Sequence, residues 1–204
     1  AVSQVKENMD LYPEKPIMHG EVCFEGMHGG SGPKVQRFLF WSNMMMGTCG
    51  FSYGVEGIWQ FNSEEKLFGA SPHGNVWGNV PWEVAYKYKG SEQVGLGKKI
   101  LEKYDWWKLK PDSALIKEQG EIFKAYASSI PGKMVMAYLY KSPTGYNPVT
   151  ITQLESNQQY SLLWHDPITG DEVYGGIVTS NDIGEWAVPG TPVKQDWVLV
   201  LEKL

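Results

Sequence analysis

The chain has 204 residues, 42% of them hydrophobic and 13% aromatic, which is enough apolar material for one large domain or two small ones. Its 18 basic residues, of which Arg37 is the only arginine, are outnumbered by 23 acidic residues, so the formal net charge is −5. Nucleic-acid binding usually needs clustered Lys and Arg, and this balance argues against that class. No apolar run approaches the ~18 residues that a membrane span requires.

Charge and aromatic residues are unevenly distributed along the chain. Residues 1–110 carry 12 basic and 12 acidic side chains, whereas residues 111–204 carry 6 and 11. Six of the nine tryptophans precede residue 110. These shifts predict a domain boundary near Pro111. The N-terminus has neither an initiator Met nor a signal-peptide pattern, so we expect a chain that was processed or cut from a longer one.

The first elements are predicted from apolar spacing and from proline. Residues 2–11 show the spacing of an amphipathic helix, and two following prolines end it. The segment KPIMHGEVCFEG, residues 15–26, then predicts a short buried strand that leads into a Gly-rich loop, as strands that carry a site often do. If this strand stays extended to its end, alternation places four side chains on one face. These are His19, Glu21, Cys23 and Glu25.

Two of these side chains, Glu21 and Glu25, are candidate reactive groups. A pair of carboxylates at the end of a strand suggests acid–base or nucleophilic work on a glycosidic bond. Most Asp and Glu side chains are simply exposed, so the alternative is that both are solvated or ion-paired loop residues. The residues alone leave both interpretations open.

A helix is predicted to follow the Gly-rich loop. Pro33 suits its first position, Met46 lies at the end of its buried side, and Gly47 suits its C-cap. Apolar residues nearly all round predict that it is covered on more than one side. Residues 48–53 then predict a second short buried strand, and strand, helix and strand of these lengths favour a parallel βαβ unit.

The remainder of the first half is less regular. Residues 62–88 show no stable period, and a loop of this length in a compact domain is usually functional. Residues 91–104 predict a last helix. Because a parallel sheet needs cover on both faces and two strands cannot close one, the segment is incomplete as a free-standing domain.

Cys23 and Cys49 are the only cysteines. If the two predicted strands are parallel neighbours, the thiols lie at opposite ends, beyond the ~7 Å limit between α-carbons of a disulfide. We therefore expect two buried thiols.

From about residue 111 the apolar pattern changes to a period of two. Seven short strands separated by Pro/Gly turns predict an antiparallel β-sandwich. The predicted strands are residues 121–127, 133–140, 149–151, 160–165, 172–174, 184–188 and 197–201.

Several motifs, in the expected order, resemble one protein family. The closing part of the apiosidase-like glycoside hydrolases is similar to three segments of the first half: KPIMHGEVCFEG, VQRFLFWSNMMMGTCGFSYGVEGIWQF and GLGKKILEKYDWWKLKPDSALI. The collagen-binding-type β-sandwich that follows the barrel in that family is similar to MVMAYLY, LLWHDPITGDEVYGG and DWVLVLE. The resemblance implies an α/β plus all-β chain. Residues 1–110 would be the C-terminal portion of a (β/α)8 TIM barrel, strands seven and eight with their helices, and residues 111–204 an antiparallel β-sandwich.

The resemblance also implies an activity on plant-type glycans. Glu21 would be the nucleophile at the end of strand seven, and the acid/base carboxylate would come from strand four. About six βα units of the barrel are absent, so we expect a fragment or subunit that is inactive alone and has the missing N-terminal part of the barrel as its partner. Glu25 would otherwise be the reactive group, or a loop carboxylate that binds a sugar hydroxyl or an arginine. A secreted, periplasmic or cell-surface location is implied.

Four further residues are candidates for contacting the glycan. Trp59 could stack on a sugar ring, or it could be a core or lid residue. Tyr53 could hydrogen-bond the nucleophile or simply pack, and His19 could contact substrate, orient Glu21 or lie satisfied in the core. For Trp82 the alternatives are a wall of the pocket and a residue that only holds its own loop in place. The four histidines show no metal-ligand spacing, so no metal or cofactor is expected.

Two other functions are compatible with the sequence. The chain could be a non-catalytic binding module whose sandwich engages carbohydrate or a matrix protein. The sandwich could instead be purely structural, and burial of Trp164, Trp186 and Trp197 would favour that interpretation.

Overall fold

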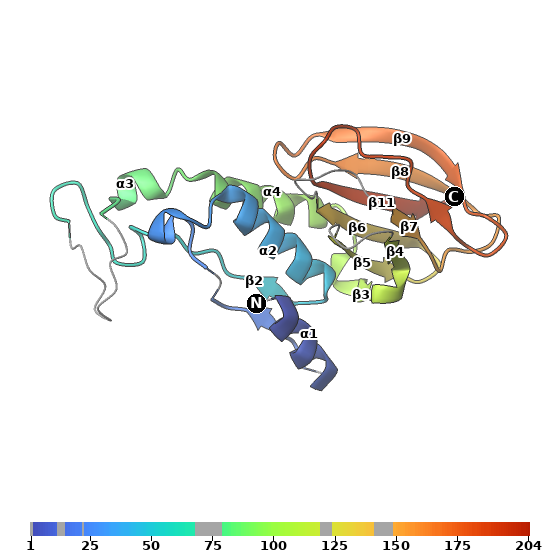
Figure 1. Ribbon diagram of the computed structural model, residues 1–204, viewed down its shortest axis with the longest axis horizontal. Coiled ribbons are helices and arrows are strands. Elements are labelled where there is room, and N and C mark those ends of the chain that lie inside the picture. The colour runs from blue at the N-terminus through green and yellow to red at the C-terminus, as the bar shows by residue number, and fades with distance from the viewer. Residues whose placement is uncertain (1, 12–14, 22, 68–78, 119–123, 141–148) are drawn as a thin grey trace. The chain divides into compact units, whose positions relative to one another are not determined.

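A computed structural model describes residues 2–11, 15–21, 23–67, 79–118, 124–140 and 149–204 (Figure 1). Backbone contacts divide the chain into two compact units. One comprises Ala1–Asn43 and Thr48–Lys99, and the other Met44–Gly47 and Ile100–Leu204. Within the described residues, no helix combines the length and the apolar character that crossing a membrane would require.

The first unit is built on a parallel βαβ arrangement. Helix α1 (Val2–Leu11) precedes strand β1 (Met18–His19), and helix α2 (Pro33–Met45) joins β1 to strand β2 (Gly50–Phe51). The two strands pair in parallel, Met18 with Gly50 and His19 with Phe51. The predicted helices at both places and the parallel pairing are confirmed, although each strand is only two residues long.

The placement of four side chains on one face required a strand that stays extended to Glu25, and this condition is not met. Strand β1 ends at His19, and the chain returns to the second strand segment only through an isolated parallel bridge between Glu25 and Val55. As a result Glu21 is exposed, whereas the Glu25 side chain is buried with 3% exposure. The alternation fails because the extended backbone on which it depends is interrupted.

Two further helices begin in the second half of the first unit's sequence. Helix α3 (Trp82–Ala85) lies in the segment for which no period was found, and part of that segment, including Trp77, lies outside the described residues. Helix α4 (Lys89–Leu101) overlaps the helix predicted over residues 91–104. It begins two residues earlier than predicted and ends three residues earlier.

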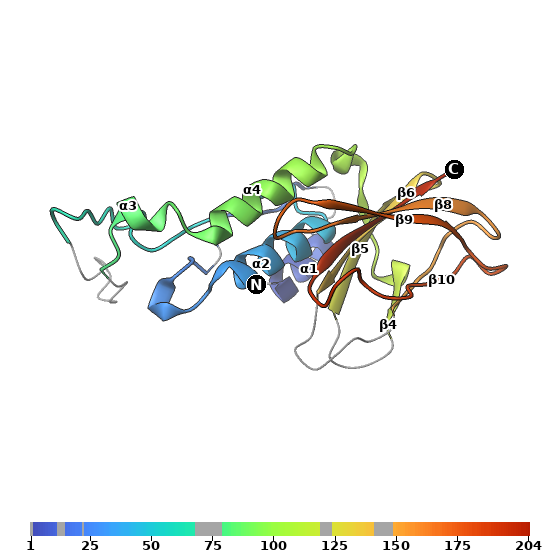
Figure 2. The same cartoon turned by 90° about the horizontal axis from the view of Figure 1, so that it is seen from above.

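Helices α2 and α4 lie side by side in both views (Figures 1 and 2). Their contact is close, because a Cβ at Gly97 would lie 2.3 Å from Cε1 of the Phe40 ring. The buried Arg37 Nη1 also donates to Gln93 Oε1 at 2.6 Å. Trp41 is fully buried, in agreement with the prediction of a helix covered on more than one side.

Both cysteines are free, but the prediction of buried thiols is wrong. Cys49 is exposed and Cys23 is half-buried. Cys49 lies between Gly47, whose φ is +89°, and Gly50, where the backbone turns from α2 into β2. The thiol thus belongs to the turn before the strand and not to its packed part.

The second unit contains two antiparallel sheets. The six-stranded sheet has the order β3 (Lys110–Pro111), β5 (Lys124–Ile130), β6 (Met134–Tyr140), β11 (Trp197–Lys203), β8 (Gln159–His165) and β9 (Glu172–Thr179). The three-stranded sheet has the order β10 (Trp186–Ala187), β7 (Val149–Ile151) and β4 (Ile116–Glu118). Every predicted strand overlaps an observed one.

Side chains from both sheets form one apolar core. It includes Ile151 of β7, Leu139 of β6, Trp164 of β8 and Leu199 of β11, all almost fully buried. Strands β6 and β11 are buried on both faces over most of their length, which explains why their sequences, MVMAYLY and WVLVL, are apolar almost without alternation.

A buried histidine at the end of β8 joins the large sheet to the segment after α4 in this unit. His165 is fully buried, with Nε2 2.6 Å from the Tyr104 hydroxyl and Nδ1 3.4 Å from Oε1 of Glu172. Lys103 donates to the same Glu172 oxygen at 2.6 Å. Burial lowers the pKa of His165 to about 4, the Glu172 carboxylate opposes this, and the Lys103 ammonium adds to it.

This pKa makes the stability of the second unit depend on pH. Between pH 6.5 and about 4 the unfolded chain binds a proton that folded His165 does not, so the free energy of unfolding should fall as the pH falls through that window. One pKa unit corresponds to about 1.4 kcal/mol, so we expect a loss of up to ~3 kcal/mol. Urea unfolding at several pH values measures it. In H165N the slope between pH 6.5 and 5 should largely disappear, and an unchanged slope would contradict the assignment.

Two glycines of α4 allow a controlled test of the packing between α2 and α4, because one lies at the contact and the other faces open space. Gly97→Ala should destabilise the first unit by roughly 1–3 kcal/mol, since the Phe40 ring must move away from the new Cβ. A Cβ at Gly95 meets nothing within 4 Å, so Gly95→Ala should stabilise the same helix by about 0.5–1 kcal/mol through propensity alone. Denaturant unfolding measures both, and equal effects would show that the helices are not in close contact.

Candidate active site

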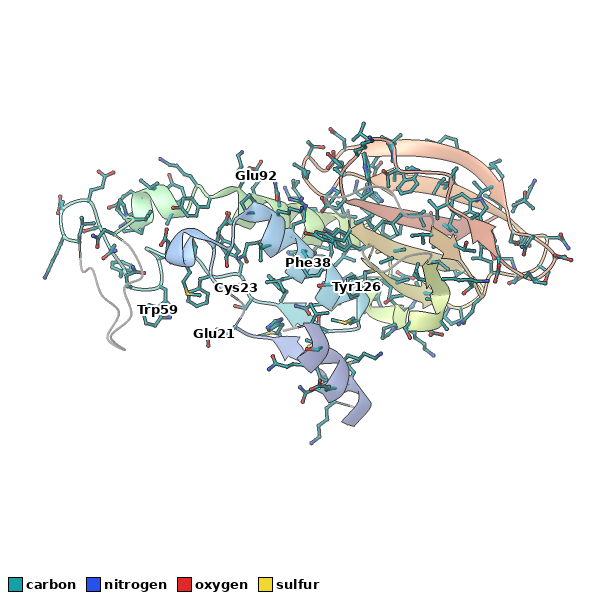
Figure 3. The ribbon with its side chains drawn as sticks, viewed as in Figure 1. Glu21, Cys23, Phe38, Trp59, Glu92 and Tyr126 are labelled. Atoms are coloured by element: carbon teal, nitrogen blue, oxygen red, sulfur yellow. The ribbon has the colours of Figure 1, made fainter. Side chains whose placement is uncertain are left out.

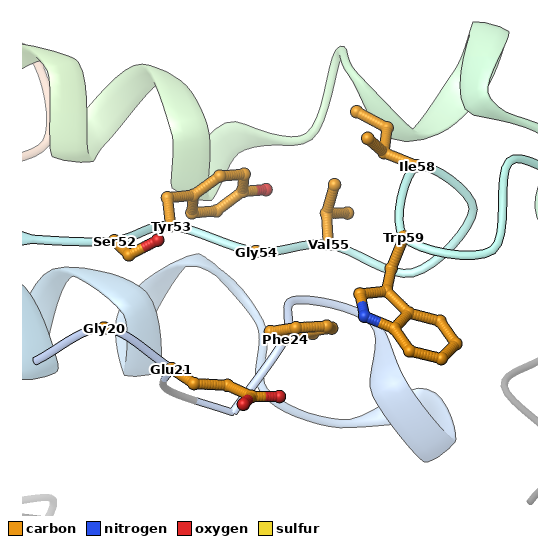
Figure 4. A pocket seen from close by; sticks show the side chains of 9 residues that line it. All are labelled: Gly20, Glu21, Phe24, Ser52, Tyr53, Gly54, Val55, Ile58 and Trp59. Carbon is orange, nitrogen blue, oxygen red and sulfur yellow. The ribbon is translucent and has the colours of Figure 1, made fainter. Parts of the chain in front are cut away.

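A pocket of about 370 Å³ lies in the first unit, between the loop after β1 and the segment after β2 (Figure 4). In Figure 4 the Glu21 carboxylate lies on one side of the Phe24 ring and the Trp59 indole lies on the other. The lining residues are Gly20, Glu21, Phe24, Ser52, Tyr53, Gly54, Val55, Ile58 and Trp59. Three sequence-predicted site residues, Glu21, Tyr53 and Trp59, are thus brought together.

Parallel pairing explains why these residues meet. Glu21 follows β1 by two residues and Trp59 follows β2, and the carboxyl ends of parallel neighbours lie at the same edge of a sheet. The Trp59 side chain is 40% exposed, and its ring centroid lies 6.5 Å from that of Phe24. An accessible carboxylate next to an accessible indole can present a nucleophile to a sugar whose apolar face lies on the ring. Figure 3 shows Glu21 at the outer side of this unit.

Phe24 was not predicted as a site residue. Its side chain is almost fully buried and forms the floor of the pocket between Glu21 and Trp59 (Figure 4). An apolar residue between two candidate carboxylates gives no chemical signal in the sequence, and only the folded loop shows that its ring supports the site.

Tyr53 does not bind the predicted nucleophile. Its hydroxyl donates to Oε2 of Glu25 at 2.6 Å, so the predicted hydrogen bond to Glu21 is replaced by one to the neighbouring acid. Burial raises the pKa of Tyr53 well above its usual range, and the hydrogen bond to Glu25 and the charge of that carboxylate raise it further. Tyr53 therefore lines the pocket as a neutral phenol.

Glu25 is buried outside the pocket lining, in contrast to Glu21. Besides the Tyr53 hydroxyl, its carboxylate accepts the Gly90 backbone N–H in the first turn of α4 at 3.1 Å. A Cβ at Gly90 would lie 2.1 Å from Oε2 of Glu25, so the helix can approach the acid this closely only with glycine at that position.

A second buried carboxylate, Glu56, was not singled out from the sequence. It is 6% exposed and accepts from the Tyr88 hydroxyl at 3.4 Å. Burial raises the pKa of Tyr88, and the charge of Glu56 and its hydrogen bond add to that rise. Gly26, with φ +81°, lies against it, because a Cβ there would be 2.5 Å from Oε1 of Glu56. The sequence signal that could have pointed to Glu56 is its place in GVEG, where a glycine follows it directly and another precedes it by two residues.

His19 lies on β1 but is not among the residues that line the pocket. Its Nδ1 lies 2.6 Å from Nδ2 of the fully buried Asn43, and its ring meets Phe51 edge-on. Partial burial lowers the pKa of His19, while the hydrogen bond to Asn43 opposes the shift. The neutral ring is therefore fixed by α2 and β2.

Trp82 also lies outside the pocket lining. It begins α3, its backbone N–H donates to the Asn62 carbonyl at 2.8 Å, and its ring lies 6.0 Å from that of Tyr86. With 39% exposure it is a surface residue at the start of this short helix. Among the described residues, no three His, Cys, Asp or Glu side chains are grouped so that they could hold a metal ion.

Comparison with known protein families identifies the first half of the chain. Residues 1–108 match the family model described as "Apiosidase-like, catalytic domain". The chain belongs to the apiosidase-like family. Residues 110–202 match a second model, "Putative collagen-binding domain of a collagenase". A search of curated proteins finds no match to this apiosidase-like chain.

Two solved structures with the same fold have titles that describe glycoside hydrolases. One, titled "Glycoside hydrolase", has a TM-score of 0.78 and 21% identity over 98% of the apiosidase-like chain. Another, a glycoside hydrolase family 5 protein from Bacteroides vulgatus ATCC 8482, has a TM-score of 0.78 and 19% identity over 98%. The present chain spans 45% and 44% of their lengths.

The contact of Gly26 with Glu56 can be tested against a second left-handed glycine of the same loop. Gly29→Ala should cost about 1–2 kcal/mol, because its φ is +70° while a Cβ there meets nothing within 4 Å. Gly26→Ala should carry the same backbone cost and in addition displace Glu56, for a total of roughly 2–4 kcal/mol. Denaturant unfolding compares the two, and equal losses would argue against the contact.

Proposed function

We propose that this chain is the end of a glycoside hydrolase barrel, strands seven and eight with their helices, followed by a β-sandwich from about residue 111. Parallel strands β1 and β2 with α2 between them have the connectivity of such a barrel. A pair of two-residue strands needs further strands at its edges to form a closed sheet, and the Met18 side chain of β1 is 58% exposed. The remaining strands would come from the N-terminal part of the barrel, either in the same polypeptide or in a second one.

Glu21 is the proposed nucleophile, and one observation supports it most strongly. Its carboxylate is the exposed acid of a pocket that also holds the Trp59 indole, at the carboxyl ends of two parallel strands. Glu25 and Glu56 are buried and already bound to tyrosine hydroxyls. Active sites of such barrels lie at this end of the strands.

In the proposed reaction a Glu21 oxygen forms a bond to the anomeric carbon while the bond to the leaving oxygen breaks. A second carboxylic acid, about 5 Å away in a retaining enzyme, gives its proton to the leaving oxygen. Water then attacks the same carbon, the second carboxylate takes the proton of that water, and Glu21 is released. Glu21 is the acid that lines the pocket, so the proton donor would belong to the N-terminal part of the barrel.

The proposed substrate is a plant-type glycan. Trp59 would stack on one sugar ring, and the Phe24 ring beneath would keep the indole in place. Glycans of this kind lie outside the cell, so we propose a secreted, periplasmic or cell-surface protein.

The sandwich is proposed to be structural. Trp164 and Trp197 are 4% and 3% exposed and stack edge-to-face on each other, while Trp186 is half-buried against the same core. These aromatic side chains stabilise the sandwich interior and do not offer a flat stacking surface. The alternative of a carbohydrate- or matrix-binding module stays a prediction, and the match of residues 110–202 to a model described as a putative collagen-binding domain is the observation in its favour.

Hydrolysis of plant glycosides by this chain, alone and combined with the polypeptide that precedes it, tests the proposal. We expect no turnover by the chain alone and turnover by the combination, because the proton donor is supplied from outside. In the active form Glu21→Gln should lower kcat by roughly 10³-fold or more, since the covalent step is lost. Trp59→Ala should mainly raise KM, by about tenfold.

Glu92→Gln is the matched control, because Glu92 is an exposed residue of α4 that forms a surface ion pair with Lys89. Figure 3 shows it on the opposite side of the unit from Glu21. Its kinetics should equal those of the unaltered enzyme. Robust hydrolysis by the isolated chain would refute the shared barrel, and full activity of Glu21→Gln would refute the nucleophile.

A further inference from the structure

Glu25 is tied to its surroundings by four hydrogen bonds. Its carboxylate accepts from the Tyr53 hydroxyl and the Gly90 N–H. Its own N–H donates to the Gly54 carbonyl at 2.9 Å, and its carbonyl accepts the Glu56 N–H at 3.0 Å. One residue thus connects the loop after β1, the segment after β2 and the first turn of α4.

Two of the segments that Glu25 connects form the pocket. Glu21 lies four residues before it in the same loop, and Tyr53 and Gly54 line the opposite wall. Glu21 itself is exposed, so its position relative to that wall depends on where the loop is fixed. On its C-terminal side the loop is fixed first at the Cys23 carbonyl, which accepts from Gln36 Nε2 of α2 at 2.7 Å, and then by the bonds of Glu25, which alone among these join it to the segment that forms the Tyr53 wall.

We propose that Glu25 is a positioning residue that holds the Glu21 loop against the Tyr53 wall of the pocket. The inference rests on the proposed function of Glu21, and it gives Glu25 a role that acts through other residues. Hydrogen bonds to a carboxylate are roughly twice as strong as neutral ones, so this bond is suited to fixing a loop. A misplacement of ~1 Å in such a site can cost on the order of 10²-fold in rate.

The direction of the hydrogen bond between Tyr53 and Glu25 is part of this positioning role. The single proton of the Tyr53 hydroxyl is donated to Glu25, so Tyr53 does not donate to Glu21. Glutamine at position 25 would keep the shape and could still accept from Gly90, but its amide group would face the Tyr53 oxygen as a donor. The Tyr53 hydroxyl would then be able to donate its hydrogen bond to other acceptors, and the Tyr53 side chain would no longer be held in one orientation in the pocket wall.

A double-mutant cycle on the 204-residue chain tests the link itself. Glu25→Gln, Tyr53→Phe and the double variant are compared by denaturant unfolding, with Glu92→Gln as the control on an exposed glutamate. We expect the two single effects on the unfolding constant to be coupled by about tenfold, and the control to change it less than about twofold. Additive single effects would overturn the proposal, because Tyr53 would then not depend on Glu25.

Kinetics of the hydrolytically active form separate positioning from reaction. Glu25→Gln and Tyr53→Phe should each lower kcat by roughly 10–100-fold with KM changed less than about threefold, and the double variant should be no worse than the poorer single one. Azide, an external nucleophile, should restore turnover to Glu21→Ala but not to Glu25→Ala.

The possible failures can be told apart. Full kcat in Glu25→Gln would overturn positioning while leaving the nucleophile in place. Restoration of Glu25→Ala by azide would make Glu25 the reacting carboxylate and overturn the inference. An unimpaired Glu21→Ala would refute the proposed function, and the unfolding cycle would still report whether Glu25 fixes Tyr53.

Discussion

A carboxylate that is 3% exposed must be matched by donors, because an ionised acid without partners is very unfavourable in an apolar interior. At Glu25 these donors are the Tyr53 hydroxyl and the N–H of Gly90 at the positive end of α4. Satisfying one side chain therefore places three chain segments relative to one another. The pocket wall, the Glu21 loop and the start of the helix all depend on this contact.

This dependence follows from the shortness of the sheet. Strands β1 and β2 pair over only two residues each, so the sheet ladder does little to fix the loops beyond its end. Beyond the strands, the two segments are joined by the parallel bridge between Glu25 and Val55. The hydrogen bond from the Tyr53 hydroxyl to the Glu25 carboxylate joins them a second time. Close packing of α2 on α4 at Gly97 also holds the helix that carries Gly90 in place. A single added methyl group at Gly97 would meet the Phe40 ring.

Local patterns were sufficient to predict most of the fold. Pro33 and Gly47 marked the limits of α2, and the strands of the sandwich followed from their alternation and turns. The meeting of Glu21 and Trp59 also followed, since parallel strands bring their carboxyl ends together. The exposed Cys49 was missed because its turn, and not the strand beside it, sets its environment.

The partners within the site could not be predicted from local patterns. Glu25 meets Tyr53 across 28 residues of sequence and Gly90 across 65, and neither spacing carries a periodic signal. Burial of Phe24 and Glu56 likewise depends on which loop folds over which. Sequence reasoning therefore found the residue types of the site and left open which acid binds which hydroxyl.

Three glutamates near the pocket show how burial divides roles among identical side chains. Glu21 is exposed and can approach a ligand, whereas Glu25 and Glu56 each receive a tyrosine hydroxyl inside the unit. A nucleophile needs access to a carbon atom, and a positioning acid needs saturated hydrogen bonds, so one carboxylate cannot easily serve both needs. Exposure, rather than closeness in sequence, is thus the property that separates the proposed reacting acid from the acids that hold its loop in place.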